Sequence, residues 1–461
     1  MTFLTKKSAR AVPITPINAE SLKGWLKDQG KQVQNWVEAS GFTGADGSVL
    51  TIPDAKGHVA QVLVGAGKDT SLYTYAALPG SLPKNSDGYY FDTRMSRDRA
   101  TQAALGWALG SYQFAQYKTC RKKEFSPLVW PDKADRDYVE AAAGAMYLVR
   151  DLVNMPANDL GPEEIADAAA KAVKGAGATM KVITGKELLK KNYPAVYEVG
   201  KGSPRAPRLI DIRWGKEKHP MVTLVGKGVA FDTGGLDIKP DTAMLLMKKD
   251  MGGAAHVLGL AQMIIAAKIP VRLRVLIPAV ENSVDGESFR PGDIIKTRKG
   301  LSVEIGNTDA EGRLILCDAL TEGCSEKPEL LVDFATLTGA ARVALGPDLP
   351  ALFSNDRELA RELLDCSESV QDPLWQLPLW QPYKDWLNSK VADTNNIGGS
   401  FAGAITAALY LEKFVDADVP WVHIDTFAWN NSSKPGRPEG GEALGMRAVY
   451  ELIRNRYGKK H

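Results

Sequence analysis

The sequence predicts an α/β protein with a smaller mixed α/β N-terminal domain and a larger C-terminal domain, whose mostly parallel central sheet is flanked by helices. Short apolar runs of strand length alternate with helical patterns from Asn154 onward, which is typical of parallel strands covered by helices on both faces. The chain has 461 residues, which is long for one hydrophobic core. We therefore expect an N-terminal domain at 1–130, a linker helix at 134–153 and a C-terminal domain at 154–461.

Helices and short strands are both expected in the N-terminal domain. Residues 19–27 have a helical pattern, and the apolar run at 59–64 predicts a strand. The linker helix is predicted because Tyr138, Ala142, Met146 and Val149 recur at a spacing of three to four residues.

The C-terminal domain shows the alternation most clearly. Strands are predicted at 180–183, 222–225, 271–278 and 330–334, and helices at 162–173, 254–267 and 314–323. In open parallel sheets, ligands bind beyond the carboxyl ends of the strands. The loops that carry Asp232 and Asp309 are expected at these ends.

Composition and charge exclude several classes of protein. The chain is 44% hydrophobic and 24% charged, and its formal charge of +2 argues against strong general attraction to nucleic acid or membranes. No stretch approaches the roughly 18 apolar residues of a membrane span, and the N-terminus lacks the pattern of a secretory signal. We therefore expect a cytoplasmic protein. The four cysteines form no CxxC pair and are expected to be reduced packing residues, with a catalytic thiol as the alternative.

A row of polar residues at 307–313 is the most informative motif. Asn307, Asp309, Glu311 and Arg313 are two apart, so an extended segment would place all four on one face. Crowded carboxylates repel each other unless cations neutralise them or solvent surrounds them. Because apolar runs flank the row on both sides, a functional site is favoured over a solvated surface, and the row resembles half of a metal site.

A second polar cluster lies between residues 226 and 250. It contains Lys227, Asp232, Lys239 and Asp250. A phosphate-binding loop is unlikely because the GxxxxGK[ST] spacing is absent, and an aspartic protease needs two copies of the Asp-Thr-Gly motif, of which this chain has one. Asp250 could cap the helix expected from about Gly252 just as well as it could belong to a functional site. Both lysines could be ordinary surface residues.

Together the two clusters supply four carboxylates, two lysines and one arginine near predicted strand ends. Such oxygen-rich sites suit two divalent cations that share carboxylate ligands. The five histidines have no ligand spacing such as HExxH, and His256, within an apolar helix, is expected to be a hydrogen-bonded core residue. The GxSxG motif of a serine nucleophile is also missing.

The run at 307–314, Asn-Thr-Asp-Ala-Glu-Gly-Arg-Leu, resembles the signature of the leucyl (cytosol) aminopeptidase family. The block from Lys227 to Asp250 is similar to that family's other metal-binding segment and has the same internal spacing. Further agreement occurs at 150–154, 281–282, 290–293, 335–340 and 403–408. The resemblance covers the chain from about residue 150 to the end.

The resemblance implies a two-metal aminopeptidase with zinc or manganese, and with magnesium or cobalt as alternatives. It implies that Asp232 and Glu311 bridge the two ions, that Asp309 completes one site through its carboxylate and main-chain carbonyl, and that Lys227 and Asp250 complete the other. Lys227 would have to ligate as a neutral amine. A water molecule that bridges the ions would be the nucleophile.

The same resemblance assigns the remaining site residues. Lys239 would stabilise the oxyanion, and Arg313 would hold a bicarbonate that acts as general base. Residues expected to contact the substrate, with a pocket for an apolar first residue such as Leu or Met, are Met247, Asn307, Thr336 and Gly339.

The family resemblance also implies peptide substrates and a homohexamer. One alternative is a DNA-binding or regulatory protein on the same scaffold, since residues 1–130 carry 16 Lys and Arg against 10 Asp and Glu, a net charge of +6. Its footprint would be Arg94, Arg97 and Arg99 with the run Arg121-Lys122-Lys123, although such charges are usually a solvated face. Another alternative is a related hydrolase of Cys-Gly dipeptides or other small amides.

Overall fold

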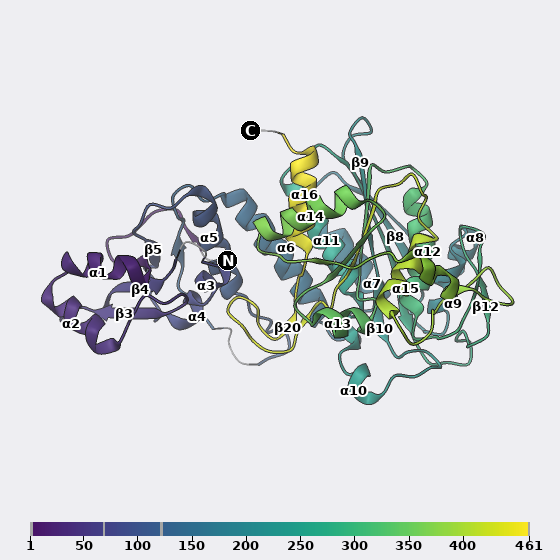
Figure 1. Cartoon of the computed structure of the whole chain (residues 1–461), viewed down its shortest axis with the longest axis horizontal. Helices are drawn as coiled ribbons and strands as arrows, with labels where there is room; N and C mark the ends of the chain where they lie inside the picture. The colour runs from purple at the N-terminus through teal and green to yellow at the C-terminus, as the bar shows by residue number, and fades with distance from the viewer. Residues whose placement is uncertain (1–2, 68–69, 120–122, 460–461) are drawn as a thin grey trace. The chain divides into compact units, whose positions relative to one another are not determined.

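A computed structural model of the chain describes residues 3–67, 70–119 and 123–459. The chain divides into two compact units, Met1–Gly144 with Ser432–Glu439, and Ala145–Asn431 with Gly440–His461. The division falls within helix α6 (Arg136–Asn154), at the position of the expected linker helix. Figure 1 labels many of the elements described below.

The first unit contains a six-stranded sheet in the order β1-β6-β5-β2-β4-β3, in which only the β3–β4 pair is antiparallel. Its strands are β1 (Phe3–Leu4), β2 (Val12–Ile17), β3 (Val49–Pro53), β4 (Val59–Gly65), β5 (Tyr89–Phe91) and β6 (Leu128–Val129), and its helices are α1 (Ala19–Lys27), α2 (Lys31–Ser40), α3 (Leu72–Ala76), α4 (Leu78–Ser81) and α5 (Arg97–Gly110). The predicted helix at 19–27 is α1, which begins where the Asn18 side chain accepts a hydrogen bond from the Ser21 amide (2.8 Å). The mixed α/β N-terminal domain is confirmed.

Two of the basic residues proposed to bind nucleic acid form contacts with other residues of this unit. Arg97 forms an ion pair with Asp135 (2.9 Å), and Arg99 donates hydrogen bonds to the Tyr75 hydroxyl and to the Gly67 carbonyl. Arg121 and Lys122 lie outside the described residues.

Two predictions from composition can be compared with the described residues. Cys317, Cys324 and Cys366 are free and buried, as expected for packing residues, whereas Cys120 lies outside the described part of the chain. In the described residues, no helix is both long enough and apolar enough to cross a membrane.

The second unit contains a nine-stranded sheet in the order β16-β15-β18-β14-β9-β11-β8-β7, with β10 paired to β11. Its strands are β7 (Thr179–Thr184), β8 (Arg208–Trp214), β9 (Met221–Gly226), β10 (Gly228–Asp232), β11 (Arg272–Asn282), β14 (Leu330–Ala335), β15 (Ala351–Ser354), β16 (Trp375–Gln376) and β18 (Trp421–Asp425). The central pairs β18–β14, β14–β9, β9–β11 and β11–β10 are parallel, and antiparallel pairs lie toward the edges. The predicted mostly parallel sheet is confirmed.

Helices cover this sheet on both faces. They are α7 (Pro162–Ala172), α8 (Glu187–Lys190), α9 (Pro194–Gly200), α10 (Asp241–Met244), the 3-10 helix η1 (Met247–Met251), α11 (Gly252–Ala266), α12 (Glu311–Cys324), α13 (Gly339–Leu345), α14 (Arg357–Ser369), the 3-10 helix η2 (Gln381–Leu387), α15 (Gly403–Glu412) and α16 (Met446–Tyr457). In Figure 1, α11, α14 and α16 lie on one side of the central strands, and α9, α12 and α15 lie on the other. Strands β9 and β14 are therefore buried along their whole length, which explains their continuous apolar sequences.

Two small sheets complete the unit. One joins β12 (Ile294–Lys296), β13 (Ser302–Glu304) and β17 (Thr394–Asn395), and the other joins β19 (Trp429–Asn430) and β20 (Gly440–Gly441). The first of these leads the chain into the segment that precedes α12.

The predicted elements of this unit agree with the observed ones apart from their ends. Strands β7, β9, β11 and β14 and helices α7, α11 and α12 correspond to the predicted segments. The strand predicted to end at Pro278 continues to Asn282, because Pro278 still pairs with Leu209 of β8 and Ala279 pairs with Gly228 of β10.

Parallel pairing brings the carboxyl ends of four strands to one edge of the sheet. Lys227 directly follows β9, Asp232 ends β10, Thr336 directly follows β14 and Asp425 ends β18. The fold thus collects polar residues where ligands bind in sheets of this type.

Helix α11 begins very close to these strand ends. The Lys227 amide donates to the Phe334 carbonyl (3.0 Å), and the Ala254 amide donates to the Lys227 carbonyl (2.8 Å). A Cβ atom on Gly253 would lie 2.1 Å from the Phe334 carbonyl oxygen, so only glycine allows this approach. The packing of α11 therefore fixes the backbone of Lys227.

The close approach at Gly253 gives a stability prediction. Gly253→Ala should lower the free energy of unfolding by about 3 kcal/mol or more, because the added methyl group meets rigid backbone. Gly144→Ala in α6 is the control, since nothing lies within 4 Å of the added Cβ there, and it should raise stability by about 0.5–1 kcal/mol. Urea unfolding measures both, and an unchanged Gly253→Ala variant would show that α11 can shift without cost.

Candidate metal centre

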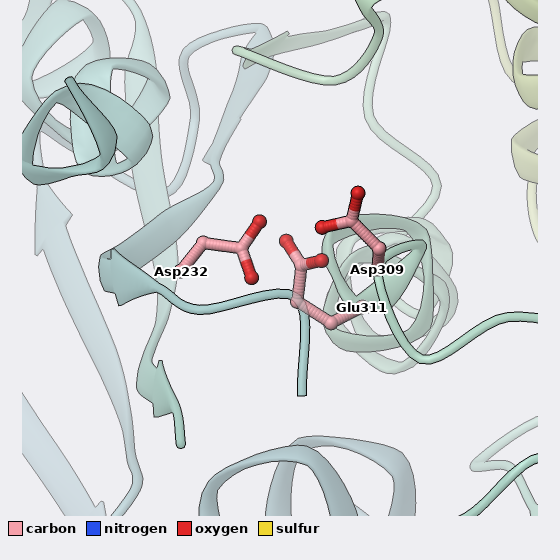
Figure 2. A group of neighbouring side chains, drawn as sticks. All are labelled: Asp232, Asp309 and Glu311. Atoms are coloured by element: carbon pink, nitrogen blue, oxygen red, sulfur yellow. The ribbon is translucent and has the colours of Figure 1, made fainter. Parts of the chain in front are cut away.

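Three carboxylates from different segments converge at this edge of the sheet. Asp232 ends β10, Asp309 lies in the turn before α12, and Glu311 is the first residue of α12. One oxygen atom from each lies within 4.8 Å of the others. Figure 2 shows the three side chains pointing toward one another.

The extended row predicted for residues 307–313 is wrong. The Asn307 side chain accepts a hydrogen bond from the Asp309 amide (2.7 Å), which folds this segment into a turn, and α12 begins at Glu311. Glu311 and Arg313 therefore belong to a helix and do not share a face with Asn307. The carboxylates still meet, because the turn directs Asp309 toward the first residue of the helix.

Lys227 and Asp250 extend the cluster. The Lys227 ammonium lies 2.7 Å from Asp250 Oδ2 and 3.0 Å from Glu311 Oε1, and it donates to the Thr336 carbonyl (3.1 Å). The Thr336 hydroxyl donates to Asp250 Oδ1 (2.7 Å). Asp250 lies within η1 and does not cap α11, whose N-cap is Met251, so the capping alternative is not observed.

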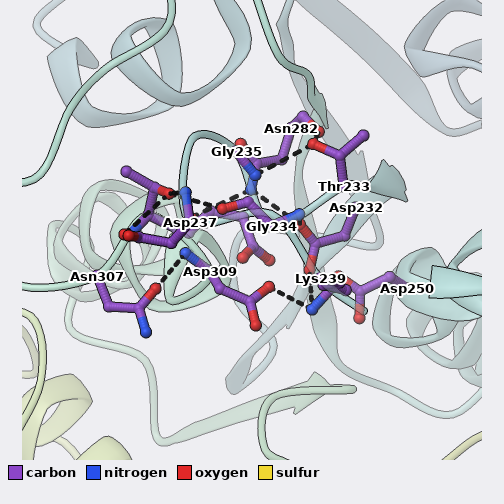
Figure 3. A network of polar contacts seen from close by, with 12 residues as sticks. Asp232, Thr233, Gly234, Gly235, Asp237, Lys239, Asp250, Asn282, Asn307 and Asp309 are labelled. Atoms are coloured by element: carbon purple, nitrogen blue, oxygen red, sulfur yellow. Dashed lines mark hydrogen bonds and ion pairs between the residues drawn. The ribbon is translucent and has the colours of Figure 1, made fainter. Parts of the chain in front are cut away.

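Lys239 occupies the opposite side of the cluster. Its ammonium lies 2.8 Å from Asp232 Oδ2 and also pairs with Asp309, as drawn in Figure 3. The loop between Asp232 and Lys239 turns sharply at Gly234 and Gly235, where φ is 88° and 66°. The Gly234 amide also donates to Asp232 Oδ1 (2.8 Å), which fixes this carboxylate.

Crowding and burial set the electrostatics of the cluster. Burial, and then the nearby Asp232 charge, raise the pKa of Glu311 well above its usual range and the pKa of Asp309 to about 6. Burial opposes the charged form of Lys227, but Asp250, Glu311 and Asp232 outweigh burial and raise the pKa of Lys227. The cluster therefore favours the charged form of Lys227 and disfavours the ionised forms of Asp309 and Glu311.

The donor set fits divalent metal ions. Glu311 is 1% exposed, and neither of its oxygens accepts a hydrogen bond within the described residues; the same holds for Asp250 Oδ2. Lys227 reaches these carboxylates at ion-pair distance only, without hydrogen-bond geometry. These buried carboxylate oxygens therefore have free lone pairs. Divalent cations prefer such oxygen ligands.

Asn282 links the two segments that carry the carboxylates. Its side-chain amide donates to Asp232 Oδ1 (2.8 Å) and to the Thr308 carbonyl (3.1 Å). The Thr308 hydroxyl donates in turn to the Gly234 carbonyl (2.6 Å), and the Thr308 amide donates to Asp237 Oδ2 (2.8 Å). The pair Glu281-Asn282 carried part of the family resemblance, but the sequence alone indicated no role for it.

Asn396 was missed by sequence analysis. Its side chain accepts from the Gly306 amide (2.8 Å) and donates to the Asn307 carbonyl (2.7 Å), so it holds the turn from outside. The Asn396 main-chain carbonyl accepts a hydrogen bond from Arg313 Nη1 (2.6 Å). The buried Arg313 Nε has no acceptor within the described residues. No local pattern could reveal Asn396, because these contacts join segments far apart in the sequence.

A cavity of about 440 Å³ opens beside the carboxylates. Predicted site residues that line it are Lys227, Asp232, Lys239, Met247, Asp250, Asp309, Thr336 and Gly339. Asn307, Glu311 and Arg313 do not line it: Glu311 is buried within the cluster, and Asn307 orders the turn. Lining residues that the sequence analysis did not name as site residues include Lys249, Thr338, Arg342, Asp425 and Phe427.

His256 is a core residue, as predicted. Its Nδ1 lies 2.7 Å from the Gly252 carbonyl oxygen, and its Nε2 accepts from the Leu444 amide (3.0 Å). It is fully buried and does not belong to the carboxylate cluster.

Comparison with known families agrees with this geometry. Residues 147–450 match the model of the cytosol aminopeptidase family catalytic domain, and residues 12–131 match that of the M17 aminopeptidase N-terminal domain. The chain belongs to the cytosol aminopeptidase family. Membership makes it a metal-dependent peptidase that acts as an aminopeptidase, and it confirms the family indicated by the run at 307–314.

Relatives and solved structures resemble the chain over most of its length. A probable cytosol aminopeptidase of Roseiflexus castenholzii is 41% identical over 76% of this chain and 75% of its own, and one of Agrobacterium fabrum is 37% identical over 93% and 92%. The crystal structure of the Coxiella burnetii cytosol aminopeptidase has a TM-score of 0.94 and 48% identity, covering 99% of both chains. The bottromycin maturation enzyme BotP in complex with Mn has a TM-score of 0.88 and 32% identity, covering 97% of this chain and 100% of its own.

The position of Asn282 behind Asp232 gives a testable prediction. Asn282→Ala should lower activity and metal affinity by about 10- to 100-fold, because Asp232 loses a donor that orients it. Asn388→Ala is the matched control, since Asn388 is exposed and its side chain forms no hydrogen bond within the described residues. Titration with Mn²⁺ and steady-state kinetics measure the effect, and wild-type values for Asn282→Ala would rule out this orienting role.

Proposed function

We propose that the chain is a two-metal aminopeptidase that removes the N-terminal residue from peptides. The environment of Glu311 carries this proposal. This carboxylate is buried, and its oxygens accept no hydrogen bond within the described residues. It lies between two groups of side chains, Asp232 with Asp309 and Lys227 with Asp250. A carboxylate in this position is suited to bridge two cations.

The proposed ligands follow from this arrangement. Asp232, Asp309 and Glu311 would hold one ion, and Lys227, Asp250 and Glu311 the other, with Asp232 shared. Zinc or manganese is proposed, and the neighbour solved in complex with Mn supports manganese. When bound, such ions supply Lewis acidity, which activates water as a nucleophile and polarises the scissile carbonyl.

Lys239 is proposed as the stabiliser of the oxyanion. Burial opposes its charge, but Asp232, Glu311 and Asp309 outweigh burial and raise the pKa of Lys239, so the side chain stays an ammonium. It lines the cavity beside Asp232 and Asp309, where a substrate carbonyl would meet it. A fixed cation at that position is worth about a hundredfold or more in rate.

Arg313 is proposed to hold a bicarbonate that acts as general base. Its Nη1 is committed to the Asn396 carbonyl, but its buried Nε lacks an acceptor within the described residues and is available to an anion. Asn307 is proposed to act through Asp309, whose amide it binds.

An apolar N-terminal residue such as Leu or Met is proposed as one class of substrate. Met247, Thr336 and Gly339, which the resemblance placed around the first side chain, line the cavity. Leu246 and Leu349 add apolar surface to its wall. A homohexamer and a cytoplasmic location remain proposals from the family resemblance, and DNA binding and Cys-Gly hydrolysis remain alternatives.

The requirement for a free N-terminus tests the proposed function. Leu-p-nitroanilide should be hydrolysed in the presence of Mn²⁺, whereas the N-acetyl derivative should react at least about a hundredfold more slowly, because acetylation removes the basic amine through which an exopeptidase site recognises its substrate. Exhaustive chelation should abolish hydrolysis, and restored Mn²⁺ or Zn²⁺ should recover it. Equal rates for the two substrates would identify a general amidase instead.

A further inference from the structure

Lys249 is a buried lysine in the wall of the cavity that the proposed mechanism does not use. It lies in η1 between Lys248 and Asp250, it is 5% exposed, and it lines the cavity. Within the described residues, its ammonium forms no hydrogen bond and no ion pair. It differs in this respect from Lys227 and Lys239, which both pair with carboxylates.

A second cation approaches the same aromatic ring as Lys249. The Lys249 ammonium is 5.1 Å from the centroid of the Phe427 ring, and the Arg342 guanidinium is 4.9 Å from the same centroid. Arg342 is exposed on α13, also lines the cavity, and its side chain has no hydrogen bond or ion pair within the described residues. We call Lys249, Arg342 and Phe427 the cationic wall.

The acidic residues near the cationic wall already have other partners. Asp250 is bound by Lys227 and by the Thr336 hydroxyl. Asp425 accepts from the Leu337 amide (2.9 Å), the Thr338 amide (3.2 Å) and the Thr338 hydroxyl (2.6 Å). Burying an ammonium group without a counter-charge is costly, and an aromatic ring compensates only in part. A negative group that enters the cavity would supply the missing partner.

We infer that the cationic wall, through Lys249 and Arg342, binds a carboxylate of the peptide substrate. This inference rests on the proposed aminopeptidase function. The carboxylate has two possible sources: the side chain of an N-terminal Glu or Asp, or the free C-terminus of a very short peptide. Met247 and Leu246 in the same cavity offer apolar surface to the methylene groups of such a residue. The cavity can therefore accept a residue with a carboxylate as well as the apolar residues proposed above.

Two pairs of matched substrates separate these sources. Glu-p-nitroanilide and Gln-p-nitroanilide differ only in a side-chain charge, and Leu-Gly and Leu-Gly-amide differ only in a C-terminal charge. The enzymes to compare are the Mn²⁺-loaded wild type, Lys249→Met, Arg342→Gln and Lys248→Met. Lys248 is the control, because it donates to the Asn154 carbonyl (2.8 Å) and does not line the cavity.

The readout is the ratio of kcat/KM within each pair, which cancels differences in folding and metal content between variants. For wild type, the charged member of one pair should be preferred by about tenfold or more, the gain expected of a charge-assisted hydrogen bond. Lys249→Met should reduce that ratio by about tenfold, Arg342→Gln by about threefold because it is exposed, and Lys248→Met should not change it.

Each outcome has a defined meaning. A Lys249-dependent preference in the Glu/Gln pair identifies the side chain as the source, and one in the Leu-Gly pair identifies the C-terminus. Absence of preference in both pairs, or a preference that Lys249→Met leaves intact, overturns the inference. Failure of the proposed function would look different, because then no member of either pair would be hydrolysed by the Mn²⁺-loaded wild type.

Discussion

The electrostatic constraint at Glu311 governs the organisation of the second unit. Four carboxylates and two lysines gather at one edge of a buried sheet, and Glu311 lies among them with both oxygens free of hydrogen bonds in the described residues. Such crowding is unfavourable unless cations hold it together. Lys239 supplies one positive charge from within the chain, and Lys227 supplies another as long as it is not a metal ligand. The metal on which the family depends would supply the rest, with Lys227 then a neutral amine.

The surrounding backbone serves to keep these charges in place. Parallel strands bring Lys227 and Asp232 to the same edge, and Gly253 lets α11 approach closely enough to fix the Lys227 backbone. A Cβ on Gly312 would lie 2.5 Å from Lys227 Cε, so a larger residue there would displace the end of this side chain from its position in the cluster. Asn282 and Asn396 then tie the carboxylate segments to each other and to distant parts of the chain. The positions of the polar site residues therefore depend on the packing of the strands and helices that carry them.

Periodicity and composition predicted the alternating strands and helices, since strands buried on both faces need continuous apolar runs. The same reasoning placed Asp232 and Asp309 at strand ends, which is correct for Asp232 at the end of β10 but not for Asp309, which lies in the turn before α12. It failed for residues 307–313, because the hydrogen bond that the Asp309 amide donates to the Asn307 side chain competes with extended backbone, and no two-residue pattern reveals that competition. It also missed Asn396 and Lys249: the first acts only through tertiary contacts, and the second differs from ordinary lysines only in its burial.

The number of metal ions bound per chain measures directly whether Glu311 serves both proposed metal sites. Wild type, Glu311→Ala and Lys239→Ala should be dialysed against Mn²⁺ and their metal content measured by elemental analysis. We expect about two ions for wild type, a marked loss for Glu311→Ala because Glu311 would contribute to both sites, and near-normal content for Lys239→Ala, which should lose activity only. Full occupancy in Glu311→Ala together with loss of metal in Lys239→Ala would contradict the assignment of ligands and of the oxyanion stabiliser.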